Sequence, residues 1–76
     1  MNVVFYTRLG CHLCDEAREM LLDAAVEFSE VDVDDDRVSQ RRYGERVPVI
    51  EADGAVVAEG NLTGVPLKSL LEKVGR

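Results

Sequence analysis

The pattern of apolar and polar residues near the N-terminus predicts a strand followed by a helix. Residues 2–6, Asn-Val-Val-Phe-Tyr, form a short apolar run rich in β-branched and aromatic side chains, which is typical of a buried strand. Gly10 interrupts this run, and from His12 onward the apolar residues recur with helical spacing. The apolar stripe of the predicted helix consists of Leu13, Ala17, Met20, Leu21 and Ala24.

Three further strands are predicted downstream of this helix. Residues 27–33 are predicted to form a second strand, although the alternation of apolar residues slips between Phe28 and Val31. Residues 47–59, VPVIEADGAVVAE, contain two more runs that meet at Asp53-Gly54. Because Asp-Gly favours a two-residue turn between antiparallel strands, this segment predicts a β-hairpin.

A short helix is predicted between the second strand and the hairpin. Residues 30–36, EVDVDDD, are acidic, and one of Asp34 to Asp36 is expected to cap the helix at its N-terminus. The helix is expected to reach Tyr43, with Gly44 directly after its end. Its apolar residues are few, so its pattern is the weakest in the chain.

The C-terminal segment predicts a last amphipathic helix, with Thr63 and Pro66 suited to its first turn. Its apolar stripe consists of Leu67, Leu70, Leu71 and Val74. The resulting order is β-α-β-α-β-β-α, in which the first strand–helix–strand unit is parallel and the hairpin antiparallel. We therefore expect one α/β domain over residues 1–76, with a mixed four-stranded sheet between two helical layers.

Composition and charge narrow the range of partners. The chain has 76 residues and a net charge of -6, which argues against nucleic acid or an anionic membrane as a partner because both require a basic surface. Its apolar runs are too short to span a bilayer, and its N-terminus does not resemble a signal peptide. We expect a monomer in the reducing cytoplasm, without a nucleic-acid or membrane partner.

The two cysteines, Cys11 and Cys14, are expected at the start of the first helix. Structural disulfides are rare in reducing compartments, and a bridge that closes four residues would stabilise the fold by only about 2 kcal/mol. The free N–H groups of a helix start favour a thiolate, so Cys11 is the candidate nucleophile. Cys14 lies one turn further, on the inward side, where it suits the role of resolving thiol.

Other interpretations of these residues remain open at this point. The two cysteines fit a pair of reduced structural thiols, whereas a zinc site would have only His12 as a third ligand and would lack the fourth. His12 is either a solvated residue or one that tunes the thiol pKa. Tyr6 and Tyr43 are expected to be packing residues. The basic residues after the acidic run form either a solvated face or an anion-binding patch; they are Arg37, Arg41, Arg42 and Arg46.

The segments YTRLGCHLCDEA and RVPVI, taken with the order of elements, resemble the glutaredoxin branch of the thioredoxin-like superfamily. The resemblance covers essentially the whole chain and is closest to small glutaredoxin-like proteins filed as a domain of unknown function. It implies a thioredoxin-like fold and a dithiol–disulfide oxidoreductase of cell redox homeostasis, with Cys11 and Cys14 as catalytic residues. It also implies a cis Val47–Pro48 peptide bond facing the cysteines. The substrate-binding residues expected on this basis are Arg8, His12, Val47, Pro48 and Gly60.

The chain departs from the glutaredoxin pattern where glutathione is bound. His12-Leu13 replaces the usual Pro-Tyr between the cysteines, and Arg46 replaces the threonine of Thr-Val-Pro. Residues 58–64, AEGNLTG, keep Gly60 but lack the aspartate of the family pattern. We expect no bound cofactor, a disulfide-containing protein or low-molecular-weight thiol as substrate, and a thioredoxin- or glutathione-type reductant. The alternatives are a binding module without fast thiol exchange and a glutathione-assisted iron–sulfur cluster carrier.

Overall fold

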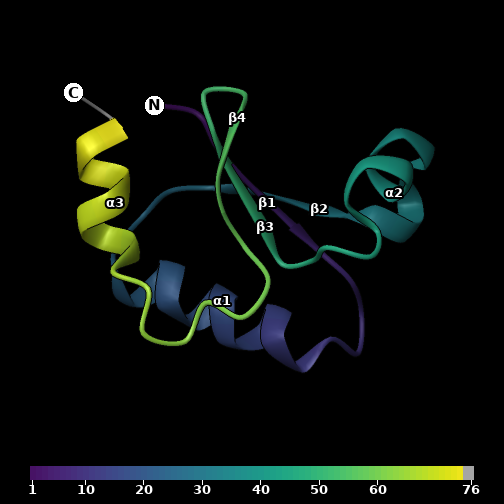
Figure 1. Cartoon of the computed structure of the whole chain (residues 1–76), viewed down its shortest axis with the longest axis horizontal. Helices are drawn as coiled ribbons and strands as arrows, with labels where there is room; N and C mark the ends of the chain where they lie inside the picture. Colours follow the sequence, from purple (N-terminus) through teal and green to yellow (C-terminus); the bar gives the residue numbers. More distant parts are fainter. Residues whose placement is uncertain (75–76) are drawn as a thin grey trace.

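The computed structural model describes residues 1–74 and contains four strands and three α-helices in the predicted order (Figure 1). The first half comprises β1 (Val3–Thr7), α1 (His12–Asp23), β2 (Ser29–Asp32) and a 3₁₀ turn, η1 (Val33–Asp35). The second half comprises α2 (Arg37–Tyr43), β3 (Val49–Ala52), β4 (Ala55–Glu59) and α3 (Leu67–Val74). No helix within residues 1–74 has the length and apolar character needed to cross a membrane.

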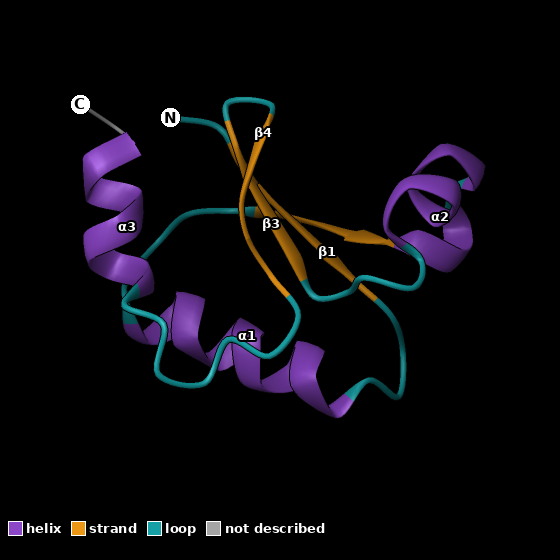
Figure 2. Cartoon of the chain, viewed as in Figure 1, coloured by secondary structure: helices purple, strands orange, loops and turns teal. Residues whose placement is uncertain are grey.

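The strands form one mixed sheet in the order β2-β1-β3-β4, drawn in orange in Figure 2. β1 pairs with β2 in parallel and with β3 antiparallel, and β3 pairs antiparallel with β4. The β3–β4 turn places Asp53 at φ 51° and Gly54 at φ 86°, the two left-handed residues of the turn that Asp-Gly favours. The parallel first unit and the antiparallel hairpin are therefore confirmed.

The larger core lies between the sheet and the pair of helices α1 and α3. Alternate residues of β1 and β3 face this side, so that Phe5 and Ile50 are fully buried there. The buried members of this cluster are Val3, Phe5, Cys14, Ala17, Leu21, Ile50, Ala52, Leu62, Leu67 and Leu71. Cys14 is thus part of the core as well as part of the cysteine motif.

The opposite face of the sheet is covered by α2, where Val33, Tyr43 and Val49 form a smaller cluster. Glu51 is buried on this face and accepts hydrogen bonds from the hydroxyl groups of Tyr6 and Tyr43. Burial, the larger cause, and the hydrogen bond to Glu51 together raise the pKa of Tyr6 to about 12. Helices on both faces confirm the three-layer α/β/α architecture.

The acidic segment supplies the helix cap that the sequence predicts, and the residue is Asp36. Its carboxylate accepts from the Val38 N–H at 3.3 Å and from the Ser39 hydroxyl at 2.6 Å. Gly44 follows α2 as expected, although its φ of −54° lies in the right-handed region, so the left-handed ending typical of glycine is not used.

Four details differ from the sequence prediction. Leu13 is 36% exposed and lies outside the buried stripe of α1, and Val74 is 38% exposed and lies outside that of α3. β2 is an edge strand over Ser29–Asp32 only, shorter than the predicted 27–33. Thr63 lies in a turn before α3 rather than in its first turn, because the helix begins at Leu67. The proline at position 66 disfavours helical geometry for the residue before it, which delays the start of the helix.

Candidate functional site

The connection between β1 and α1 places Cys11 at the N-terminal end of the helix. Gly10 adopts φ 77°, a left-handed conformation that glycine reaches without steric cost, and this turn leads the chain into the cap. Cys11 is the N-cap residue, with extended backbone at φ −89° and ψ 110°. Its sulfur accepts a hydrogen bond from the Cys14 N–H at 3.1 Å. The predicted position of Cys11 at the helix start is confirmed.

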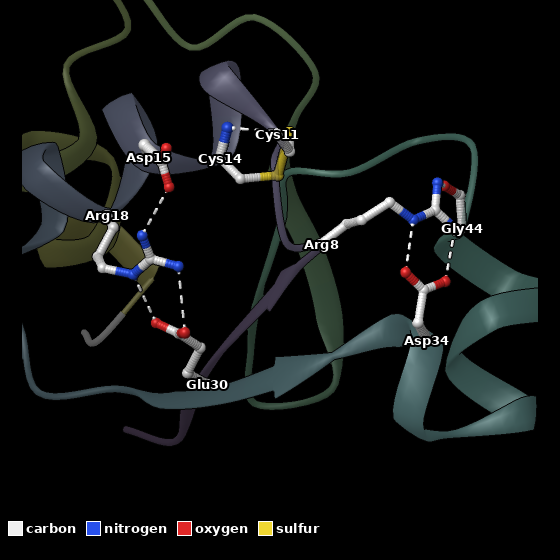
Figure 3. The surroundings of a disulfide bond; sticks show 8 residues. All are labelled: Arg8, Cys11, Cys14, Asp15, Arg18, Glu30, Asp34 and Gly44. Atoms are coloured by element: carbon white, nitrogen blue, oxygen red, sulfur yellow. Dashed lines mark hydrogen bonds and ion pairs between the residues drawn. A yellow bond between two sulfur atoms is a disulfide. The ribbon is translucent and has the colours of Figure 1, made fainter.

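Cys11 and Cys14 form a disulfide, with their Cα atoms 5.2 Å apart, a normal separation for such a bridge (Figure 3). The two residues differ sharply in burial. Cys14 is 0% exposed and belongs to the core cluster, whereas Cys11 is partly exposed and packs against the edge of that cluster. An incoming molecule therefore reaches the Cys11 sulfur first.

The charges on α1 pair away from the disulfide. Arg18 donates to Glu30 at 2.8 Å and to Asp15 at 3.0 Å, which ties the outer face of the helix to β2 (Figure 3). His12 is the first residue of α1, its side chain is 85% exposed, and its Nε2 lies 3.1 Å from Glu16 Oε1. The positive end of the helix and the Cys14 N–H are the features that act directly on the Cys11 sulfur.

Arg8 lies close to the cysteines in sequence, but its guanidinium is held elsewhere. It donates to both Asp34 oxygens, at 2.9 and 3.0 Å, and to the Gly44 carbonyl at 2.7 Å. Figure 3 shows the side chain extending from the loop before α1 toward α2, away from the disulfide. The ion pair offsets the charge of Arg8, so this residue joins the cysteine loop to α2 rather than facing the Cys11 sulfur.

Val47, Pro48 and Gly60 meet beside the sheet. The Val47–Pro48 peptide bond is cis, the isomer that the resemblance implies. The Gly60 N–H donates to the Pro48 carbonyl at 2.9 Å, which joins the segment before β3 to the end of β4. Pro48 is buried, while Val47 is partly buried and packs against the same core cluster as Cys11.

The structure thus brings Cys11, Cys14 and Val47 to one cluster, with Pro48 and Gly60 adjoining it through Val47. His12 follows Cys11 directly and points to solvent. Across the residues described, no three His, Cys, Asp or Glu side chains are grouped so as to hold a metal ion.

Sequence reasoning missed the acidic partners of the arginines near this site. Arg46 forms an ion pair with Glu59 on β4, and its guanidinium carbon lies 5.2 Å from the centre of the Tyr43 ring. Asp34 was expected only as a candidate cap, whereas it binds Arg8, 26 positions earlier in the chain. Once the strand order is known, such pairs can be predicted from opposite charges on segments that meet at the end of the sheet.

A mixed four-stranded sheet between two helical layers, with a Cys-x-x-Cys pair at the start of the first helix, defines a glutaredoxin-like protein of the thioredoxin superfamily. The model of the Glutaredoxin-like domain (DUF836) matches residues 2–72, and the chain belongs to this family. No functionally curated protein matches the chain significantly.

Solved structures support this assignment. The chain is similar to protein XcR50 from X. campestris, with 36% identity over 93% of this chain and 96% of that one and a TM-score of 0.80. It is also similar to the thioredoxin-like protein BC3987, with 30% identity, coverage of 91% and 99%, and a TM-score of 0.73. Wheat glutaredoxin shares the fold, with a TM-score of 0.68 and 16% identity over 96% of this chain and 81% of that one.

The Arg8–Asp34 pair generates a prediction for acid pH. The hydrogen bond from Arg8 is the main cause that holds the pKa of Asp34 below its usual range. A carboxyl group whose pKa is lower in the folded state stabilises the fold at pH values above its unfolded-state pKa. This stabilisation is lost as the pH falls through the folded-state pKa. Arg8→Gln should therefore return the pKa of Asp34 toward its ordinary value and flatten the acid side of the stability profile. Carboxyl NMR titration and urea unfolding measure the two effects.

Arg41→Gln is the matched control for this test. It removes one exposed arginine from α2 and should leave the pKa of Asp34 nearly unchanged, because the hydrogen bonds of Asp34 come from Arg8 and Gln40.

Because the Arg8 charge is offset by Asp34 and screened by salt, Arg8→Gln should shift the Cys11 thiol pKa by less than about half a unit. A larger shift would show that Arg8 acts on the thiolate directly.

Proposed function

We propose that this protein is a dithiol–disulfide oxidoreductase, with Cys11 as the attacking thiol and Cys14 as the resolving thiol. The observation that carries the proposal is the difference between the two cysteines. Cys11 is partly exposed at the helix N-terminus and accepts a backbone N–H, whereas Cys14 is fully buried one turn further on. Two-step disulfide exchange requires one accessible sulfur and one shielded sulfur.

In the first step, the Cys11 thiolate attacks one sulfur of a substrate disulfide. A mixed disulfide forms on Cys11, and the other substrate sulfur leaves as a thiolate that takes up a proton. Lowering a thiol pKa from about 8.5 to about 7 raises the thiolate fraction at neutral pH roughly 16-fold. The more acidic thiolate is also a weaker nucleophile, by roughly fivefold. Its attack is therefore only about threefold faster than that of an ordinary thiol.

In the second step, the Cys14 thiolate attacks the Cys11 sulfur of the mixed disulfide. The Cys11–Cys14 bond forms, and the second substrate sulfur leaves as a thiolate, so the substrate is reduced and the protein is oxidised. When a reductant reopens the bridge, its thiolate attacks the exposed Cys11 sulfur, and Cys14 leaves as the thiolate. A reductant of the thioredoxin or glutathione type then restores the dithiol, in a reducing compartment where the chain acts as a monomer.

The surroundings of Cys11 favour a polypeptide disulfide as substrate. Leu9 is 90% exposed and Leu13 is 36% exposed, and these two apolar side chains flank Cys11 in sequence on both sides. Val47 lies just before the paired segment of β3, so an extended substrate segment can hydrogen-bond to its backbone groups. Contacts of this kind recognise a peptide backbone together with apolar side chains.

Replacing Cys14 with serine should leave the first step intact and stop the second. A mixed disulfide with the substrate should then accumulate on Cys11, because no second thiol of the chain can displace it. Cys11→Ser is the matched variant and should abolish exchange, because Cys14 is buried and lies inside the helix. Mass spectrometry of both variants after incubation with a disulfide-containing peptide detects the adduct. An adduct on Cys14, or two unreactive variants beside a reactive control thiol, would favour a binding module without thiol exchange.

Glutathione is expected to bind weakly, because its carboxylates would have to compete for arginines that are already paired. Arg8 is engaged by Asp34, and Arg46 by Glu59. A new exposed ion pair between a glutathione carboxylate and one of these arginines would contribute only about 0–1 kcal/mol, so NMR titration with S-methylglutathione should show no saturation below about 1 mM.

Glu59→Gln supplies the internal comparison for this titration. The substitution removes the partner of Arg46 and should therefore strengthen binding of S-methylglutathione relative to the unaltered protein. Tight and saturable binding to the unaltered protein would instead indicate an ordinary glutathione-dependent glutaredoxin, or a carrier of a glutathione-ligated iron–sulfur cluster.

A further inference from the structure

Glu51 is a buried carboxylate that the proposed exchange steps do not use. It is 6% exposed and lies on the face of the sheet that α2 covers, opposite the face that holds Cys14. Its Oε1 accepts a hydrogen bond from the Tyr6 hydroxyl at 3.0 Å, its Oε2 accepts one from the Tyr43 hydroxyl, and Arg42 Nη2 lies 4.0 Å from Oε2. Burying a carboxylate is costly even when it is paired, and an apolar side chain often fills such a position at lower cost. The presence of Glu51 therefore points to a role beyond packing.

The hydrogen bond from Tyr43 to Glu51 closes the segment that carries Val47 and Pro48. Tyr43 is the last residue of α2, and Glu51 lies in β3, eight positions later. The whole connection from α2 to β3 lies between these two residues. Because the bond joins the two ends of this connection inside the protein, it limits the conformations that the backbone at Val47 can adopt.

Val47 also links the surroundings of Tyr43 to the cysteine site by packing. Its side chain packs against the smaller cluster, which contains Tyr43, and against the larger core cluster, at whose edge Cys11 lies. The Tyr43 ring is centred 4.7 Å from that of Tyr6, and the guanidinium carbon of Arg46, the residue before Val47, lies 5.2 Å from its centre. A shift of Tyr43 would therefore move Val47 relative to Cys11.

We infer that Glu51 and Tyr43 are positioning residues, which hold the Val47 backbone where an extended substrate segment pairs with it beside Cys11. This inference rests on the proposed exchange function and concerns the binding of a polypeptide disulfide, before either thiol reacts. A charged acceptor makes the bond from Tyr43 stronger than a bond between neutral groups. The same bond is the main cause that raises the pKa of Tyr43, so the hydroxyl stays protonated and donates at neutral pH.

Tyr43→Phe tests the inference, because phenylalanine keeps the ring and removes the hydroxyl. Single-turnover reduction of a disulfide-containing peptide by the reduced variant, over a range of peptide concentrations, gives the half-saturating concentration and the maximal rate. Loss of one backbone hydrogen bond between Val47 and the peptide should raise the half-saturating concentration roughly fivefold and leave the maximal rate unchanged. Reduction of hydroxyethyl disulfide, which has no peptide groups to pair with Val47, should keep its rate.

Tyr6→Phe is the matched control, because it removes the same group from the other hydrogen bond to Glu51. Tyr6 lies in β1, so its substitution leaves the connection from α2 to β3 closed by Tyr43. It should lower the urea midpoint of unfolding as Tyr43→Phe does, yet leave the half-saturating concentration of the peptide unchanged. Glu51→Gln is a second variant, which keeps the shape of the side chain and removes its charge. It weakens the bond from Tyr43 and should raise the half-saturating concentration by a smaller factor.

An unchanged half-saturating concentration in both Tyr43→Phe and Glu51→Gln would overturn the inference. An equal rise in Tyr6→Phe would overturn it as well, because it would indicate a general disturbance of the sheet. Slower reduction of hydroxyethyl disulfide by Tyr43→Phe would do the same, because it would place the defect at the cysteines rather than in peptide binding. Failure of the unaltered protein to reduce either disulfide would instead overturn the proposed function itself.

Discussion

The hydrogen bond from the Cys14 N–H to the Cys11 sulfur is the interaction on which the site depends. It makes Cys11 the cap of α1, so the group that would react is also the group that satisfies a free N–H at the helix start. Substituting Cys11 therefore changes the helix end as well as the chemistry. Cys14 follows within the first turn, where the packing of α1 on the sheet buries it in the core, so the two sulfurs differ in exposure.

The two faces of the sheet support this arrangement in different ways. On one face, α1 and α3 pack over Phe5 and Ile50 and hold Cys14 in the core. On the other face, the buried Glu51 accepts from two tyrosines and fixes α2 against the sheet. Arg8 ties the loop that carries Cys11 to η1 through Asp34 and to the end of α2 through the Gly44 carbonyl. Within residues 1–74, the hydrogen bond to the Cys11 sulfur comes from a backbone N–H and not from a charged side chain.

Local sequence signals predicted the features that depend on neighbouring residues. The order of elements, the cap at Asp36, the turn at Asp53-Gly54 and the position of Cys11 all follow from residues a few positions apart. The features that were missed depend on residues far apart in sequence.

The Arg8–Asp34 pair spans 26 positions and the Tyr6–Glu51 bond spans 45, and each requires the strand register to be known. Glu51 was not distinguished from a surface residue, because a strand pattern does not show that α2 covers its face.

The thiol pKa of Cys11 in the reduced protein tests the central claim most directly. The Cys14→Ser variant contains a single thiol, so thiolate absorbance during a pH titration reports on Cys11 alone. A sulfur that accepts a backbone N–H at the positive end of a helix is expected to have a pKa at least about one unit below the ordinary value of about 8.5. A pKa at or above that ordinary value would contradict an activated Cys11, and with it the assignment of attacking and resolving thiols.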